Sequence, residues 1–317
     1  MDWLFRLRQR LLPTPWAAAR RARQDGKAEF EFTGMLRPAL VQASAVYLSL
    51  LEHMAISPDA PPDDVLADAA RRGGDIGRAL ATLAAPALGN PRRAAYLARV
   101  LDYAHALPGA IERQISVCRQ LWLARQAGDA DTQLLLHGAQ DRLLIGLLEH
   151  ERVFQQASAA AAPAYHPQHW IALARATLNA AMVRLLDHAS DPGRARSWGR
   201  DRADALRGLD AAEAMLRRAG ELAPRYTRAL TRRSSETGGA PMETALRALR
   251  DGLEHSIATE QAIAGDVRRL VMGLDAPPMA VTRGTAAYQG QAPLAIAGLV
   301  ARRLSPRASA EEAVRKP

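Results

Sequence analysis

The feature that most constrains the fold is a run of apolar residues at helical spacing between residues 92 and 125. Its members follow one another in steps of three or four residues, which places all of them on one face of an α-helix. They are Tyr96, Val100, Tyr103, Leu107, Ile111, Ile115, Cys118 and Trp122. A helix with such a face needs partner helices to cover it, so the rest of the chain must supply them.

Similar apolar stripes recur along the chain, the aromatic content is only 5%, and Ala and Leu dominate the composition, as in helix-rich proteins. The stripes predict further helices over about residues 33–54, 132–158, 168–188, 198–233 and 242–274. We also expect a short helix over residues 1–12. The sequence therefore predicts an all-α fold, an antiparallel helical bundle of about eight helices with flexible basic termini.

Several glycines and prolines predict breaks within these helices. Gly73-Gly74 should separate two short helices that lie between residues 63 and 88. Pro108 should kink the central helix or divide it at Leu107, because proline cannot donate the backbone hydrogen bond of a helix interior. For the same reason, Pro224 should weaken or break the helix over 198–233.

The chain divides by composition into three parts. Residues 1–27 form a basic amphipathic N-terminal segment with a turn at Asp25-Gly26, and residues 28–275 form the helical bundle domain. Residues 276–317 form a mostly disordered C-terminal tail, in which 293–304 have the pattern of one short amphipathic helix. Residues 29–32 alternate between Glu and Phe, which predicts a short extended segment.

The net charge of +9 is unevenly distributed. Residues 1–27 carry seven basic and two acidic side chains, residues 193–233 carry eleven and five, and residues 283–317 carry six and two. Almost all of the positive charge is arginine. This distribution favours contact with an anionic surface through the basic zones more than a uniformly basic fold would.

Two further features bear on the compartment. The chain has a single cysteine, Cys118, so no disulfide forms within it, and its place on the apolar face predicts a small buried side chain. No apolar run reaches the roughly 18 residues that span a bilayer, and the apolar start of the chain is interrupted by arginines where a secretory signal has none. We therefore expect a cytoplasmic protein.

The leading functional hypothesis is a non-enzymatic adaptor or scaffold that binds an acidic protein or an anionic membrane surface. The first residues predict a basic, Trp-bearing amphipathic helix, which suits peripheral attachment at the inner face of a membrane or docking onto the bundle itself. The candidate contacts are Trp3, Arg6, Arg10, Arg20, Arg21 and Arg23. No catalytic motif is present, and no cofactor is expected.

A first alternative is a metal-dependent bundle enzyme of the di-iron or di-manganese carboxylate type. Its candidate ligands are Asp102, His105, Glu149, His150, Glu254 and His255. Only the first two have the acid-x-x-His spacing that puts both ligands on one helix face, because adjacent residues point about 100° apart.

A second alternative is nucleic-acid binding through the basic zone of residues 193–233. That zone holds Trp198 and Tyr226, but these are not interleaved with the arginines as in a recognisable module. Its acidic residues suit pairs three or four residues apart on an exposed helix better than a phosphate-binding surface.

Overall fold

The computed structural model describes residues 15–56, 62–190, 197–234 and 240–273, and within them every regular element is a helix and no strand is present. The helices are α2 (Pro15–Ile56), α3 (Asp63–Ala81), α4 (Pro91–Gln126), α5 (Ala130–Ala161), α6 (Pro167–Ser190), α7 (Trp198–Ser234) and α8 (Ala240–Gly273). The predicted all-α fold is confirmed. The expected helices at 1–12 and 293–304 and the predicted tail from 276 lie outside the described residues.

The described part of the chain has seven helices where about eight were expected. The predicted division at Gly73-Gly74 is wrong, because α3 runs unbroken through both glycines. Gly73 is needed for close packing instead: a Cβ atom there would lie 3.2 Å from Cγ2 of Ile111 on α4. The glycine lets the two helices approach each other, which offsets its low helix propensity.

The prolines do not divide their helices either. Helix α4 continues through Pro108 and α7 continues through Pro224. A Cβ atom at Gly77 of α3 would lie 3.7 Å from Pro108, so the proline ring packs against a neighbouring helix. A proline removes one backbone hydrogen bond from a helix, and packing of this kind offsets that loss.

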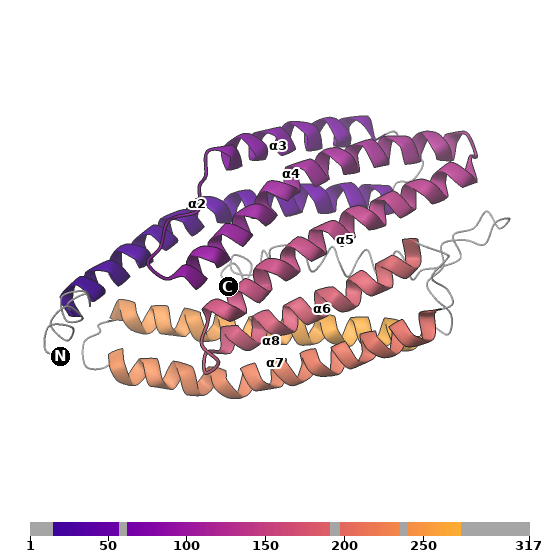
Figure 1. Ribbon diagram of the computed structural model, residues 1–317. Helices are drawn as coiled ribbons and strands as arrows, with labels where there is room; N and C mark the ends of the chain where they lie inside the picture. Colours follow the sequence, from indigo (N-terminus) through magenta and orange to yellow (C-terminus); the bar gives the residue numbers. More distant parts are fainter. Residues whose placement is uncertain (1–14, 57–61, 191–196, 235–239, 274–317) are drawn as a thin grey trace, which may run out of the picture.

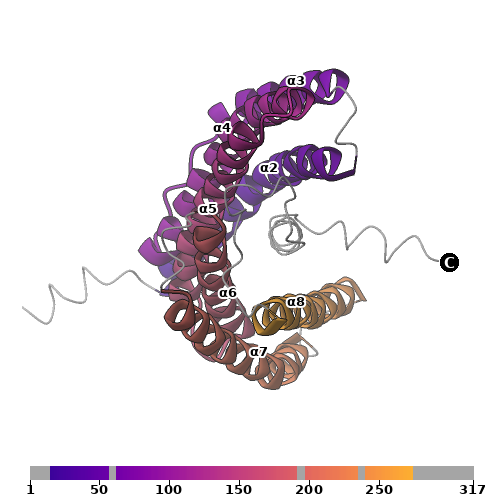
Figure 2. The same cartoon turned by 90° about the vertical axis from the view of Figure 1, so that its right-hand side faces the viewer.

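Helices α3 to α7 form a curved layer, and α2 and α8 lie on its concave side (Figure 2). Consecutive helices from α4 to α7 pack side by side, α2 packs against α3 and α4, and α8 packs against α6 and α7 (Figure 1). Short connections between neighbours make most of these pairs antiparallel, as expected for a helical bundle. We call the concave side the inner side of the layer.

The apolar stripe predicted for the central helix lies in the core. Leu107, Ile111 and Cys118 are fully buried, and Tyr96 and Ile115 pack at its edge. The buried surface of α4 is wider than one stripe because α4 packs against α2, α3 and α5. The burial predicted for Cys118 is confirmed, and burial raises the pKa of its thiol to about 11.

Two local predictions for the first half of α2 are wrong. The predicted turn at Asp25-Gly26 and the predicted extended segment at 29–32 are both helical, and α2 passes through them without a break. The alternation of Glu and Phe is divided between two sides of the helix. Phe32 is 3% exposed in the core, whereas Phe30 is 79% exposed on the surface. Burial of Phe32 with the side chains one turn further on favours the helix.

Candidate functional site on helix α2

One face of the first half of α2 carries Arg20, Arg23, Lys27 and Phe30. These residues follow one another in steps of three, four and three, so their side chains share one side of the helix. All four are exposed. We call this set the basic stripe of α2. It combines three cationic side chains with a large apolar one, the combination found on helices that lie in a membrane interface.

The opposite side of the same turns is anchored to the bundle. Oδ2 of Asp25 accepts a hydrogen bond from the backbone N–H of Gly89 over 3.0 Å, at the connection between α3 and α4. Glu29 forms an ion pair with Arg93 on α4. These two contacts fix the rotation of α2 about its axis, and so they hold the basic stripe toward solvent. The first turns of α2 extend past α3 and α4 (Figure 1).

The charge of the basic stripe is little neutralised within the described ranges. There, no carboxylate lies within ion-pair distance of Arg20 or Arg23, and the first turn of α2 contains no acid. Lys27 lies 3.6 Å from Glu31, one turn further along the helix, and both side chains are largely exposed. An exposed pair of this kind is weak and leaves the positive potential of the stripe largely intact.

The predicted contact residues fall into three groups. Arg20 and Arg23 lie on the basic stripe, as just described. Arg21 lies on another side of α2, and its side chain runs along Gly89. A Cβ atom added to Gly89 would lie 3.0 Å from Cδ of Arg21. The remaining three, Trp3, Arg6 and Arg10, lie outside the described residues.

Two members of the stripe, Lys27 and Phe30, were not among the predicted contacts. The Asp25-Gly26 pair predicts a turn, and the alternation at 29–32 predicts an extended segment that includes Phe30. A helix that runs through Asp25 places Arg20, Arg23, Lys27 and Phe30 at regular spacing on one side. This spacing is the sequence signal that identifies Lys27 and Phe30.

The structure gathers four of the six candidate metal ligands along one groove. Asp102 and His105 on α4 face Glu149 and His150 on α5 across a groove of about 720 Å³ on the outer side of the layer. Asp102 pairs with Arg99 at 3.1 Å and Glu149 pairs with Arg152, while Nε2 of His105 lies 3.2 Å from the carbonyl oxygen of Leu80. The two carboxylates are therefore directed to arginines and the imidazole of His105 to a helix end.

The other two candidate ligands are elsewhere. Glu254 and His255 are exposed on α8, which packs against α6 and α7 rather than against α4 or α5. Across the described ranges, no group of three or more His, Cys, Asp or Glu side chains is placed to hold a metal ion. The acid–His neighbours thus lie on helix surfaces. Adjacent residues of a helix point about 100° apart, so each acid and its neighbouring His are directed to different sides.

The acids of the basic zone on α7 are paired with basic side chains. Arg207 pairs with Asp204, and Arg218 pairs with Glu221 at 2.9 Å. The acids of α7 also bind an arginine of α8, since Arg268 reaches both Asp210 and Glu213. The arginines of this zone thus share the surface with carboxylates that repel phosphate groups.

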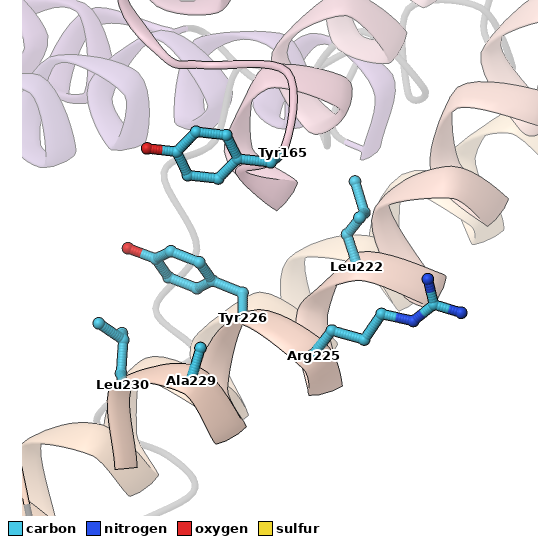
Figure 3. Close-up of a pocket in the computed structure, with 6 residues that line it drawn as sticks. All are labelled: Tyr165, Leu222, Arg225, Tyr226, Ala229 and Leu230. Carbon is cyan, nitrogen blue, oxygen red and sulfur yellow. The ribbon is translucent and has the colours of Figure 1, made fainter. Parts of the chain in front are cut away.

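A pocket of about 400 Å³ lies where the connection between α5 and α6 meets α7 (Figure 3). The rings of Tyr165 and Tyr226 lie on either side of the space, and Arg225 points away from both rings (Figure 3). The ring centroids of His166 and Tyr226 are 4.3 Å apart, and burial lowers the pKa of His166. The lining is completed by Leu222, Ala229 and Leu230. Among the described residues that line this space, there is no acidic side chain.

Residues Arg20–Leu51 of α2 are long and apolar enough, by length and composition, to cross a membrane. A helix in the core of a soluble protein passes the same test. Phe32, Leu36 and Tyr47 are buried in the core, so much of the apolar character of α2 belongs to its core-facing side.

The geometry thus defines an exposed, one-sided basic surface on α2 and, within the described ranges, no convergent set of reactive groups. The chain matches no family model, and no curated protein or solved structure is significantly similar to it.

Proposed function

We propose that this protein is a non-enzymatic binding protein that attaches to an anionic membrane face through the basic stripe of α2. The single observation that carries the proposal is the shared orientation of Arg20, Arg23, Lys27 and Phe30 on one exposed side of a helix whose other side is anchored. The bundle behind α2 would then act as a rigid body held at the membrane surface.

The charge and the apolar residue contribute in different ways. Each Lys or Arg near an anionic lipid surface contributes on the order of 1 kcal/mol to binding, so the three cations together contribute about 3 kcal/mol. Phe30 adds the burial of an aromatic ring in the interfacial region. A stripe with both terms binds an anionic membrane more tightly than a neutral one, and salt weakens the binding.

Phe30 favours a membrane over an acidic protein as the partner. Its side chain is 79% exposed, and Met35, five residues further along α2, is 57% exposed. Large apolar side chains beside cations gain from a partner that offers both anionic headgroups and acyl chains. A purely electrostatic contact with an acidic protein leaves Phe30 without a role.

The experiment is co-sedimentation of the purified full chain with vesicles of two compositions. One set contains phosphatidylcholine alone, and the other contains phosphatidylcholine with phosphatidylserine. We expect the protein to pellet with the second set at low salt and to dissociate as salt rises. Absence of pelleting with the anionic vesicles, or equal pelleting with both sets, would contradict the proposal.

A further inference from the structure

One face of α5 is buried along most of the helix. Its residues follow in steps of three, four, three, four and three, so they form a continuous stripe. They are Asp141, Leu144, Leu148, Glu151, Gln155 and Ser158, and each is at most 7% exposed. The opposite side of α5 carries the exposed residues Gly146, His150 and Val153 that line the outer groove.

This buried stripe faces the inner side of the layer. Asn179 of α6 donates to Oε2 of Glu151 over 3.0 Å, and Arg175, one turn before Asn179, donates to Glu260 of α8 over 3.0 Å. The phenol of Tyr47, which comes from α2, lies close enough to Asp141 for the two groups to interact electrostatically. The stripe therefore lies on the side of α5 where α2 and α8 are found.

Helices α2 and α8 do not cover this stripe with their own backbones. Both lie on the inner side (Figure 2). No Cα atom of α2 or α8 lies within 8 Å of a Cα atom of α5, and α2 and α8 are equally separate from each other. Side-by-side helices pack with axes about 8–10 Å apart, so a strip of α5 between α2 and α8 has no helix packed on it within the described ranges. Leu144 and Leu148 on that strip are nevertheless 0% exposed.

We propose that residues 293–304 of the same chain bind along this inner face of α5, between α2 and α8. Their sequence is the most apolar stretch that follows α8, with Ile296, Leu299, Val300 and Leu304 at helical spacing. As a helix the segment spans about 18 Å, the same length as about twelve residues of α5. It thus matches the distance from Leu144 to Gln155.

The length of the chain permits this contact. Helix α8 ends at Gly273, and residues 274–292 connect it to the segment. Nineteen residues span up to about 60 Å when extended, more than the roughly 48 Å length of α5, so the segment reaches any position on the stripe.

The charges are complementary. The inner face carries the buried carboxyl groups of Glu151 and Glu260, and Arg175 pairs with Glu260. The segment contains Arg302 and Arg303 and no acidic residue. Because the inner face is acidic and the segment is basic, the segment binds there more favourably than an acidic partner would. The same charges fix the orientation of the segment on α5.

The N-terminal residues 1–14 are a weaker match for the same surface. Residues 1–14 join α2 at Pro15, at the end of the helix that extends past α3 and α4 (Figure 1). This end carries the basic stripe. The segment 293–304 therefore suits the inner face better, and a probe in each segment distinguishes the two.

The test places a photo-crosslinking amino acid, p-benzoylphenylalanine, at Leu299 of the full chain, and mass spectrometry maps the products. We expect crosslinks within one chain to residues 141–158 of α5 and to the neighbouring sides of α2 and α8. A matched probe at Ala310, in the same tail but beyond the apolar segment, should give few α5 products. A third probe at Leu7 tests residues 1–14 in the same way.

Three results would overturn the proposal. They are crosslinks between two chains, equal α5 yields from Leu299 and Ala310, or α5 products from Leu7 in place of Leu299. A second measurement covers the case in which the probe disturbs packing. In the variant with Leu299→Asp and Val300→Asp, amide hydrogens of residues 141–158 should exchange faster by about tenfold. The variant with Ala308→Asp and Ala310→Asp should leave the exchange of those amides unchanged.

Discussion

Nε of Arg175 on α6 donates a hydrogen bond to Oε1 of Glu260 on α8 over 3.0 Å, and the side chain of Glu260 is fully buried. The same guanidinium donates from Nη2 to the hydroxyl of Ser256 over 2.9 Å. Both acceptors lie on α8, one helical turn apart, so this side chain of α6 helps to fix the position of α8 along its axis. Of the described helices, α8 packs only against α6 and α7, which makes this contact important for its position.

Removing Arg175 should destabilise the protein strongly. The Arg175→Ala substitution removes the ion pair and the hydrogen bond that Arg175 gives to the buried carboxylate of Glu260, and breaking a buried pair of this kind costs about 3–5 kcal/mol in the free energy of unfolding. Replacing both residues, as Arg175→Met with Glu260→Leu, should cost much less because both buried polar groups are replaced by apolar ones of similar size. Urea unfolding of both variants measures the difference, and equal losses would show that the ion pair has no such role.

Asp141 should make stability depend on pH. Burial raises the pKa of its carboxyl to about 7, well above the value of 3.8 in the unfolded chain. The folded state therefore binds a proton that the unfolded state releases, and the stability contribution of this group falls as pH rises from about 4 to about 7.

The Asp141→Asn substitution removes that dependence. Between about pH 5 and about pH 8, the variant should gain about 2–3 kcal/mol in unfolding free energy relative to the unsubstituted protein. Chemical denaturation of both proteins at the two pH values gives this difference directly. A difference that does not change with pH would mean that Asp141 is not titrated in this range.

The start of α4 should depend on Asn90. Its side-chain oxygen accepts hydrogen bonds from the backbone N–H groups of Arg92 and Arg93, at 3.0 and 3.3 Å, which caps the helix. Asn90→Ala should lower the unfolding free energy by about 1 kcal/mol, whereas Asn90→Asp retains the cap and should cost little. Thermal unfolding separates the two variants, and equal midpoints would contradict this role.

The fold class and most helix positions could be predicted from the sequence, because the apolar stripes have helical spacing over long stretches. The errors share one cause, which is packing that acts over long sequence separations. Locally, Gly73 predicts a break and Pro108 predicts a kink or a break, but Gly73 lies close to Ile111 and Pro108 packs against Gly77, and neither helix is divided. Neighbouring helices thus override local propensity at these positions.

The candidate site could be predicted only in part. The excess of arginine near the start of the chain identified Arg20 and Arg23 as contact residues. Lys27 and Phe30 were missed because the Asp25-Gly26 pair suggested a turn. The contact that keeps this stretch helical, from the Asp25 side chain to the backbone of Gly89, joins residues 64 positions apart. Sequence spacing does not reveal such a contact.

Phe30 should contribute to membrane binding separately from the charges. Phe30→Ser removes an exposed aromatic ring without changing the net charge, so binding to anionic vesicles should weaken by about tenfold while its salt dependence stays the same. Co-sedimentation at several salt concentrations measures both quantities. Met272→Ser, at a similarly exposed apolar residue on α8, is the control and should leave binding unchanged. Unchanged binding of the Phe30→Ser variant would remove the apolar part of the account.

The most direct test of the proposed attachment is the affinity of a charge variant for vesicles that contain phosphatidylserine. The variant carries Arg20→Gln, Arg23→Gln and Lys27→Gln. A control with the same change in net charge carries Arg119→Gln, Arg217→Gln and Arg247→Gln, at exposed positions on α4, α7 and α8. We expect the first variant to bind about 100-fold more weakly and the control to bind almost as well as the unsubstituted protein. An equal loss in both variants would show that net charge alone determines binding, and would contradict a site on α2.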